Sequence, residues 1–313
     1  MAHQLRIGLI GWGTMGRALG DLVASGPLPV ELVRVAVRDP ARARASALPP
    51  GVDIGPVDEL LADDRLDAVV ELAGGIEHPL TWARATLGRG RPYVTGNKAL
   101  LATHGGALAE LAMRDGAALL ASASVGGATP MIETVQHLGA SGRIARLRGL
   151  LNATTTFILA AMSAGQSYED ALGAAQQAGY AEPDPSFDVE GRDAAQKIAI
   201  LASVAWGGWR PELDVATRGI VGHHVPPGAT VRLVAETDER GMRVEPMELN
   251  ADEPMARVTG IECLLEIGLS DGAVVRISGP GAGGPVSVGA TYADLARLVA
   301  GERPVLFAPG PAA

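Results

Sequence analysis

A glycine-rich turn between an apolar run and a helical segment constrains the fold of this chain more than any other feature. Residues 5–10 have the composition of a buried strand, the turn Gly-Trp-Gly-Thr-Met-Gly follows at residues 11–16, and a helix is expected from residue 17 to about residue 24. In a Gly-x-Gly-x-x-Gly turn the first glycine permits a tight turn, the second lets the backbone approach a pyrophosphate, and the third lets helix and strand pack closely. The phosphates would lie at the helix N-terminus. We therefore predict a dinucleotide-binding fold; the alternative is a glycine-rich turn without a ligand.

The next segments alternate between strand and helix patterns, which predicts a Rossmann-type, doubly wound parallel sheet of the α/β class. Strands are expected at residues 30–37, 68–72, 92–95 and 119–123, and helices at residues 57–62, 80–87 and 131–138. Ala73 and Gly74 follow one of these strands, and Asn97 and Lys98 follow the next. Open α/β sheets bind ligands beyond the carboxyl ends of their strands, so we expect these residues near the cofactor.

The end of the second expected strand bears on cofactor choice. Arg38 comes first, Asp39 follows it, and Arg42 and Arg44 stand a few residues further on. An acidic residue at this place usually holds the ribose hydroxyls of NAD, whereas an arginine suits the 2′-phosphate of NADP. Arg38 therefore predicts NADP, and Asp39 leaves NAD open. Arg42 and Arg44 fit a solvated basic turn nearly as well.

Lysine is scarce in this chain, which draws attention to the lysines it keeps. Of 26 Lys and Arg residues only Lys98 and Lys197 are lysines. Arginine does not release its proton at usable pH, whereas a desolvated lysine can, so both lysines are candidates for proton transfer. Asp193 and Lys197 are four residues apart in an expected helix and share one of its faces. The alternatives are an exposed helix ion pair and chance survival of two lysines in an arginine-rich composition.

From about residue 144 the pattern changes. We expect a strand at 147–151, helices at 157–164, 168–177 and 193–204, β-like segments at 229–235, 242–246, 261–267 and 273–277, a loop at 279–285 and a closing helix at 292–300. The 313 residues suffice for two domains. We predict a dinucleotide-binding domain over residues 1–138, a substrate and catalytic domain over 139–290, and a C-terminal helix and tail over 291–313 that pack back on the nucleotide domain.

Composition excludes several functional classes. The formal charge of −9 argues against a nucleic-acid surface or an anionic membrane as partner. The sequence has no apolar run near the ~20 residues of a membrane span, and its N-terminus does not read as a signal peptide. The single cysteine, Cys263, fits a reducing cytoplasm and a core position. His223 and His224 have no third ligand at metal spacing in the sequence, so we expect them exposed and not part of a zinc site.

Several motifs carry a resemblance to a known family. They are the glycine turn at 11–16, Thr-Gly-Asn-Lys-Ala-Leu-Leu-Ala at 95–102, Ser-Val-Gly-Gly at 124–127 with Pro130, Gly-Leu-Leu-Asn at 149–152 with Thr154, the stretch 179–197, and Gly-Pro-Gly-Ala-Gly at 279–283. The stretch 179–197 is the most specific, with its Ala-Glu-Pro-Asp-Pro, Asp-Val-x-Gly and Asp-Ala-Ala-x-Lys elements. Over nearly its whole length the chain resembles homoserine dehydrogenase, the NAD(P)-dependent enzyme that links aspartate semialdehyde and homoserine. We expect a short form without the regulatory ACT domain.

The resemblance implies a role for each matching residue. Lys197 looks like the proton donor and acceptor at the substrate oxygen, Asp193 would orient it or hold the hydroxyl, and Lys98 would bridge cofactor and substrate. The residues implied in binding the small amino-acid substrate are Glu182 at its ammonium group, Asp188 and Thr154. The residues predicted to contact NADP, or NAD, are Gly11, Gly13, Thr14, Met15, Gly16, Arg38, Ala73, Gly74, Asn97, Lys98 and Gly283.

Further expectations follow from the same resemblance. The carbonyls of Val125, Gly127 and Thr129 fall where family members bind a sodium ion. Family members are usually homodimers through the sheet of the second domain, which we expect to be α/β with a mainly antiparallel sheet. We expect a cytoplasmic enzyme of amino-acid biosynthesis, leading to threonine and methionine.

The chain departs from the family pattern at four places. Ser122 replaces a usual Glu, Ala153 and Thr156 replace a usual Gly and Asn, and an Asn expected near Glu262 is missing. Ser122 weakens the sodium assignment. Ala153 and Thr156 are expected at the edge of the substrate pocket, so the substrate is left open. The alternatives are a related oxidoreductase of another small amino or hydroxy acid, an aspartate-dehydrogenase-like enzyme, and a nucleotide sensor, which would not need Lys98, Asp193 and Lys197.

Overall fold

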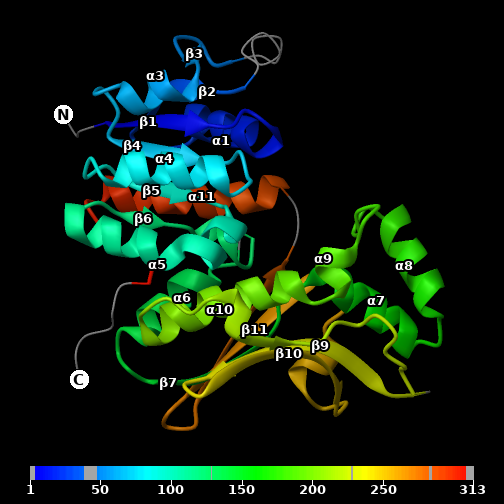
Figure 1. The fold of residues 1–313 in the computed structure, drawn as a ribbon. Coiled ribbons are helices and arrows are strands. Elements are labelled where there is room, and N and C mark those ends of the chain that lie inside the picture. Colours follow the sequence, from blue (N-terminus) through cyan, green and yellow to red (C-terminus); the bar gives the residue numbers. More distant parts are fainter. Residues whose placement is uncertain (1–3, 39–47, 128, 227, 282–283, 308–313) are drawn as a thin grey trace. The chain divides into compact units, whose positions relative to one another are not determined.

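The computed structural model describes residues 4–38, 48–127, 129–226, 228–281 and 284–307 (Figure 1). The chain forms two compact units. The first unit consists of Met1–Ala128 and Gly283–Ala308, and the second of Thr129–Ala282 and Pro309–Ala313. The sequence placed this boundary after Leu138 and the return to the first unit at residue 291.

The first unit is built on a six-stranded parallel sheet with the strand order β3-β2-β1-β4-β5-β6. Its strands are β1 (Leu5–Ile10), β2 (Val30–Ala36), β3 (Asp53–Gly55), β4 (Ala68–Glu71), β5 (Tyr93–Thr95) and β6 (Leu119–Leu120), and its helices are α1 (Thr14–Ser25), α3 (Val57–Ala62), α4 (Glu77–Leu87), α5 (Lys98–Asp115), the short η1 (Ser122–Ser124) and α11 (Gly284–Val299). This is the Rossmann strand order. Strands β2 and β3 are added on one side of β1, and β4, β5 and β6 on the other side. The predicted fold class is confirmed for this unit, and the carboxyl ends of β1 and β4 mark the switch point where a ligand is expected.

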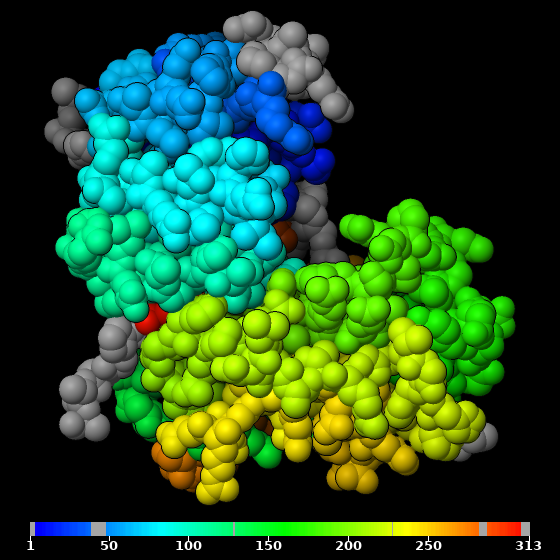
Figure 2. Space-filling view, viewed as in Figure 1, coloured from blue at the N-terminus to red at the C-terminus, as the bar shows by residue number. Residues whose placement is uncertain are grey.

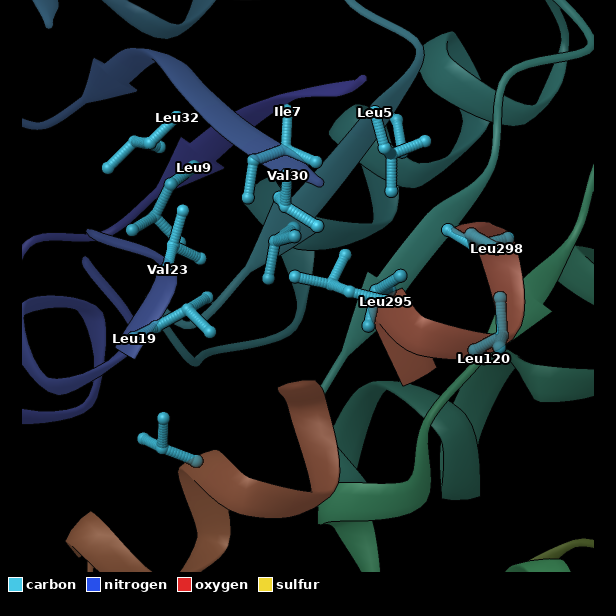
Figure 3. Packing of buried hydrophobic residues seen from close by; sticks show 14 of the residues in the cluster. Leu5, Ile7, Leu9, Leu19, Val23, Val30, Leu32, Leu120, Leu295 and Leu298 are labelled. Carbon is cyan, nitrogen blue, oxygen red and sulfur yellow. The ribbon is translucent and has the colours of Figure 1, made fainter. Parts of the chain in front are cut away.

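The C-terminal helix α11 completes the core of the first unit. Leu295 and Leu298 of α11 meet Leu19 and Val23 of α1 in one buried cluster, together with residues of β1 and β2 (Figure 3). Full burial of one such side chain contributes about 1.5–3 kcal/mol. The Tyr292 hydroxyl also accepts a hydrogen bond from the Leu28 amide at 3.1 Å. In the space-filling view, blue and cyan segments form much of the visible surface of the first unit (Figure 2).

Two parts of the predicted element map are corrected. The predicted loop at 279–285 is wrong in part, because Gly279 and Pro280 still belong to a strand and pair with Cys263 and Glu262. The closing helix begins at Gly284, earlier than the predicted residue 292. The 18-residue helix α5, which begins at Lys98, was not predicted from the sequence.

The second unit is built on a six-stranded sheet with the order β12-β11-β7-β9-β10-β8. Its strands are β7 (Ile144–Leu150), β8 (Val215–Thr217), β9 (Thr230–Asp238), β10 (Gly241–Leu249), β11 (Glu262–Leu269) and β12 (Val274–Pro280), and its helices are α6 (Met131–Gly139), α7 (Ala153–Ser163), α8 (Tyr168–Gln177), α9 (Ser186–Val189), α10 (Arg192–Trp206), η2 (Glu212–Asp214) and η3 (Pro254–Arg257). Every pair is antiparallel except β10 with β8. The expected mainly antiparallel sheet is therefore confirmed.

The helix α10 covers one face of this sheet, where it contacts β7, β9 and β10 (Figure 1). Its predicted apolar face, Ile198, Leu201 and Ala202, is fully buried. Within the described residues, no helix is both long and apolar enough to cross a membrane.

Candidate active site

The glycine turn has the backbone geometry that each glycine was expected to provide. Gly11 has a φ of 105°, in the left-handed region that favours glycine. A Cβ atom on Gly16 would lie 2.1 Å from the Gly11 carbonyl oxygen, so only glycine lets α1 start this close to the turn. A Cβ atom on Gly13 would meet nothing within 4 Å. The open side of Gly13 leaves space for a ligand at the N-terminus of α1, where an anion is favoured.

A cavity of about 1000 Å³ opens at the carboxyl ends of β1, β2 and β4 within the first unit. Its wall combines the glycine turn, the end of β2, the turn after β4 and one side of α4. The lining residues are Ile10, Gly11, Trp12, Gly13, Thr14, Arg17, Ala36, Val37, Arg38, Pro56, Val57, Leu72, Ala73, Gly74, Gly75, His78 and Trp82. Its size and its position at the switch point suit a dinucleotide.

The cavity brings together several of the predicted cofactor residues. Gly11, Gly13, Thr14, Arg38, Ala73 and Gly74 line it. Met15 and Gly16 lie in the first turn of α1. Asn97 caps the N-terminus of α5, where Lys98 is the first helical residue. Asp39, Arg42, Arg44 and Gly283 lie outside the described residues.

The lining side chains that were not predicted from the sequence include Arg17, His78 and Trp82. Arg17 follows the third glycine directly, and with Arg38 it adds a second cation to the wall. His78 and Trp82 stack with ring centroids 5.9 Å apart and an interplanar angle of 14°. Their spacing of four residues is a helical signal, which was lost because the sequence placed the start of this helix at residue 80 instead of Glu77.

We expect the variants Gly16→Ala and Gly13→Ala to separate folding from ligand binding at this turn. Gly16→Ala should destabilise the protein by about 1–3 kcal/mol, because the added methyl group overpacks against the Gly11 carbonyl. Gly13→Ala has room in the structure and should leave the melting temperature unchanged while it weakens cofactor binding. Thermal unfolding and fluorescence titration with NADPH measure the two effects. Equal melting temperatures for the two variants would contradict the packing argument.

The second unit contains a buried ion pair at the start of α10. Lys197 Nζ lies 2.8 Å from Asp193 Oδ2 and donates a hydrogen bond of 2.7 Å to the Leu151 carbonyl oxygen. The Lys197 and Asp193 side chains are only 13% and 8% exposed. The alternative of an exposed helix ion pair is therefore wrong. Among the described residues, Asp193 and Leu151 use two of the three N–H donors of Lys197.

The surroundings of Lys197 keep it protonated. Burial alone would lower the pKa of Lys197, but the Asp193 carboxylate, with Cys263 and Asp188, more than offsets burial, so the pKa of Lys197 is raised. Cys263 is buried in β11, as expected for a core residue, and burial raises the pKa of its thiol. Lys197 is thus a cation at neutral pH and can act as a general acid.

Asn152 holds the acidic groups of this site and was missed as a site residue. Its Nδ2 donates to Asp188 Oδ1 at 2.6 Å and to Asp193 Oδ2 at 2.9 Å. Its Oδ1 accepts from the Thr155 amide at 2.8 Å and from the Thr155 hydroxyl at 2.9 Å, which caps α7. All hydrogen-bonding positions of the amide are thus in use. The signal in the sequence was an Asn directly before a helix, a common N-cap.

The remaining predicted substrate residues lie around the same helix ends. The buried Thr154 hydroxyl donates to the Tyr180 carbonyl at 2.7 Å, which ties α7 to the Pro-rich loop. Glu182 lies exposed in that loop, and its backbone carbonyl accepts a hydrogen bond of 3.2 Å from Gln176. The structure therefore connects Asp188, Asp193 and Lys197 through Asn152 and their ion pair. Thr154 lies outside this network and anchors the loop in which Glu182 follows Tyr180.

The structure shows the surroundings of three of the four departures from the family pattern. Thr156 is buried, and its hydroxyl donates to the Asn152 carbonyl at 2.9 Å, one turn back in α7. Ala153 is buried at the start of the same helix. Ser122 donates from its amide and its hydroxyl to the buried Asp294 carboxylate at 2.9 and 2.6 Å. A carboxylate from α11 thus stands beside Ser122, where the family pattern has its own acidic side chain.

The residues considered for metal binding all lie in the described part of the chain. Val125 is buried, Gly127 has a φ of 63°, and Thr129 is buried. His224 is exposed and His223 half-buried; burial, with Arg218 and His224, lowers the pKa of His223. Among the described residues, no group of three or more His, Cys, Asp or Glu side chains could hold a metal ion.

A cavity that suits a dinucleotide in a Rossmann unit, and a buried Lys–Asp pair in the second unit, are features of an NAD(P)-dependent oxidoreductase. Comparison with known proteins specifies the family. The family model described as "Homoserine dehydrogenase" matches residues 130–296, and the one described as "Homoserine dehydrogenase, NAD binding domain" matches residues 11–121. The chain belongs to the homoserine dehydrogenase family.

Individual relatives agree with this assignment. The homoserine dehydrogenase of Synechocystis sp. is 35% identical over 317 residues, covering 94% of this chain and 73% of the relative. That of Sulfurisphaera tokodaii is 33% identical over 311 residues, covering 96% and 100%. Among solved structures, the Thiobacillus denitrificans homoserine dehydrogenase has a TM-score of 0.88 and 28% identity, covering 97% of this chain and 77% of the other. A hyperthermophilic archaeal homoserine dehydrogenase in complex with NADPH has a TM-score of 0.84 and 26% identity, covering 96% and 99%.

Proposed function

We propose that this protein interconverts L-aspartate 4-semialdehyde and L-homoserine by hydride transfer with NADP, assisted by proton transfer from Lys197. The observation that carries the proposal is the buried Lys197–Asp193 pair, held by the Leu151 carbonyl and by Asn152. A reaction that converts a carbonyl to a hydroxyl needs a proton source at the oxygen, and the pair supplies one in a desolvated place.

The roles of the chain's own groups follow from their contacts. When bound, the nicotinamide cofactor supplies or accepts the hydride. Lys197 gives its proton to the oxygen that becomes the hydroxyl, and takes it back in the oxidative direction. Asp193 orients Lys197 and keeps it charged. Lys98, at the N-terminus of α5, would bridge cofactor and substrate, where its charge adds to that of the helix end.

The remaining pocket residues would select the substrate. We assign Glu182 to the substrate ammonium, and Asp188 and Thr154 to the pocket wall. Asp188 is fixed by Asn152, and Thr154 anchors the loop that carries Glu182.

A substrate panel tests the function directly. NADPH oxidation is measured with aspartate 4-semialdehyde and, separately, with oxaloacetate plus ammonia. We expect turnover only with the semialdehyde. Turnover with oxaloacetate and ammonia alone would make the protein an aspartate-dehydrogenase-like enzyme, and NADPH binding without turnover of any carbonyl would make it a nucleotide sensor.

We expect Arg38 to favour NADP over NAD. Arg38 is exposed in the cavity wall at the end of β2, where the 2′-phosphate of NADP is bound in this fold. A charge-assisted hydrogen bond to that phosphate strengthens NADPH binding about tenfold or more. Arg38→Ala should therefore weaken NADPH binding by about this factor and leave NADH binding nearly unchanged, as measured by fluorescence titration.

The matched control for Arg38→Ala is Arg17→Ala. Arg17 follows the glycine turn on α1, so its removal should weaken both cofactors to a similar extent. Equal losses of NADPH and NADH binding in Arg38→Ala would contradict the assignment of Arg38.

A sodium ion, a homodimer and a cytoplasmic location complete the proposal. The carbonyls of Val125, Gly127 and Thr129 are the proposed sodium ligands, supported by the Asp294 carboxylate beside Ser122. Exchange of sodium for choline at constant ionic strength should lower the melting temperature. Sedimentation velocity measures whether the protein is a dimer, and the single buried Cys263 agrees with a reducing compartment.

A further inference from the structure

Glu71, the last residue of β4, carries a carboxylate with no exposed surface. No salt bridge of Glu71 occurs in the described part of the chain; its oxygens instead accept hydrogen bonds from three groups at the cofactor edge of the sheet. We propose that Glu71 is a positioning residue that locks the turn after β4 and the start of α5 into one geometry. The consequence for catalysis rests on the proposed role of Lys98 at the start of α5; the consequence for cofactor binding does not.

The first link joins Glu71 to the turn that lines the cavity. Glu71 Oε1 accepts from the Ala73 amide at 2.7 Å and from the Gly74 amide at 2.8 Å. Gly74 and Gly75 have φ values of 73° and 86°, which bend the turn around the carboxylate. Because both amides are committed to Glu71, this turn can offer a ligand its carbonyl oxygens and Cα atoms, but not those N–H groups. It is therefore an acceptor surface that suits the hydroxyls of a ribose rather than a phosphate.

The second link joins Glu71 to the start of α5. Glu71 Oε2 accepts from the Thr95 hydroxyl at 2.7 Å, and the same hydroxyl oxygen accepts from the Asn97 amide at 2.9 Å. Asn97 Oδ1 accepts from the Leu100 amide at 3.1 Å and so caps the helix that Lys98 begins. Asn97 Nδ2 donates to the Gly75 carbonyl at 2.7 Å. These bonds close a ring that returns to the first turn.

The positions of the hydrogen-bond donors argue against the alternative that Glu71 only holds β4 and β5 together. The strands β4 and β5 already pair through their backbones up to Glu71 and Thr95. An apolar pair at these two buried positions would avoid the cost of burying a carboxylate. Two of the three groups that Glu71 holds, the Ala73 and Gly74 amides, lie instead in the turn after β4, and this turn lines the cavity. A buried acid at this edge therefore serves the geometry of the ligand site.

Variants at Glu71 and Thr95 test the proposal in the full-length protein. Glu71→Gln keeps one oxygen for the two amides, but its amide N–H groups then face the Thr95 hydroxyl, whose own proton loses its acceptor. Thr95→Val removes the hydroxyl, whereas Thr95→Ser keeps it. Thr86→Val is the matched control, because Thr86 is a buried threonine of the same unit whose hydroxyl has no hydrogen-bond partner in the described structure.

The readouts are the melting temperature, the NADPH dissociation constant from direct titration, and kcat at saturating NADPH and aspartate 4-semialdehyde. We expect Glu71→Gln and Thr95→Val each to raise the dissociation constant and lower kcat by about tenfold, the effect of one hydrogen bond to a charged group. Thr95→Ser and Thr86→Val should stay near wild type in both. The double variant Glu71→Gln, Thr95→Val should be no worse than Thr95→Val alone, because both changes break the same link.

The proposal is overturned if Glu71→Gln and Thr95→Val lower the melting temperature but keep the wild-type dissociation constant and kcat. That result is expected if Glu71 only stabilises the fold. It is also overturned if their effects simply add. If Glu71→Gln does not fold, the comparison of Thr95→Val with Thr95→Ser decides alone. The NADPH titration needs no substrate, so a wild-type protein that binds NADPH but fails to reduce the semialdehyde would contradict the proposed function while the titration still tests Glu71.

Discussion

Replacing Lys197 by arginine is expected to lower turnover by about 10²–10⁴-fold, the usual contribution of a general acid or base. Arginine keeps the positive charge beside Asp193 and five N–H donors, so the ion pair can persist. A guanidinium does not release its proton at usable pH. The variant therefore removes the transferable proton and leaves the electrostatics of the site nearly intact.

The measurements that isolate this effect are kcat in both directions, the NADPH dissociation constant and the melting temperature. Because the cavity with the glycine turn lies in the first unit and Lys197 in the second, NADPH binding should be unchanged. Arginine is preferable to methionine here, since methionine would leave Asp193 buried without its partner and destabilise the protein by about 3–5 kcal/mol. Near-normal turnover of Lys197→Arg would remove Lys197 from the chemistry.

The Rossmann unit could be predicted from the sequence because its signals are local. The strand at residues 5–10 and the helix at 57–62 have the predicted bounds. Helix α5 was missed because Gly105 and Gly106 interrupt its pattern. Its apolar residues also show little helical periodicity across the 18 residues. Its N-cap, Asn97, was instead taken as a residue after a strand that contacts the cofactor.

The contacts of the site were harder to predict than its residues. The spacing of Asp193 and Lys197 predicted that they share a helix face, but not that they are buried. Asn152 precedes Asp188 by 36 residues and Asp193 by 41, and no local pattern reports a contact over such a separation. Glu71 lies only two and three residues before its amide donors. Even so, the sequence could not show that this carboxylate turns inward, because an acidic residue at a strand end more often faces water.

Replacing Asp193 by asparagine is expected to move the pH dependence of the reaction to lower pH. Burial is the largest influence on the pKa of Lys197 and lowers it, while the Asp193 carboxylate, with Cys263 and Asp188, raises it above its ordinary value. Asparagine keeps the shape and can still accept from Asn152, but it carries no charge. The pKa of Lys197 should therefore fall in the variant, since burial then acts with less opposition.

The sign of the change differs between the two directions of the reaction. Reduction needs Lys197 protonated, so its rate falls as pH rises through this pKa; in Asp193→Asn that fall should begin at lower pH. Oxidation needs Lys197 neutral, so its rate rises through the same pKa and should reach its plateau at lower pH in the variant. The stability of the folded protein depends on pH for the same reason. In the wild type, the raised pKa of Lys197 stabilises the folded state fully at pH values below the ordinary lysine pKa. This contribution is lost as the pH rises through the raised pKa of Lys197.

The matched control for this prediction is Asp188→Asn. Asp188 shares the Asn152 amide with Asp193, and its charge also raises the pKa of Lys197, but only as the weakest of the groups named. Its replacement should therefore shift the pH profiles in the same direction by a smaller amount. Profiles of kcat for both variants, measured in both directions, check the order of the two shifts. If Asp193→Asn lowers kcat without moving either profile, Asp193 orients Lys197 but does not set its protonation.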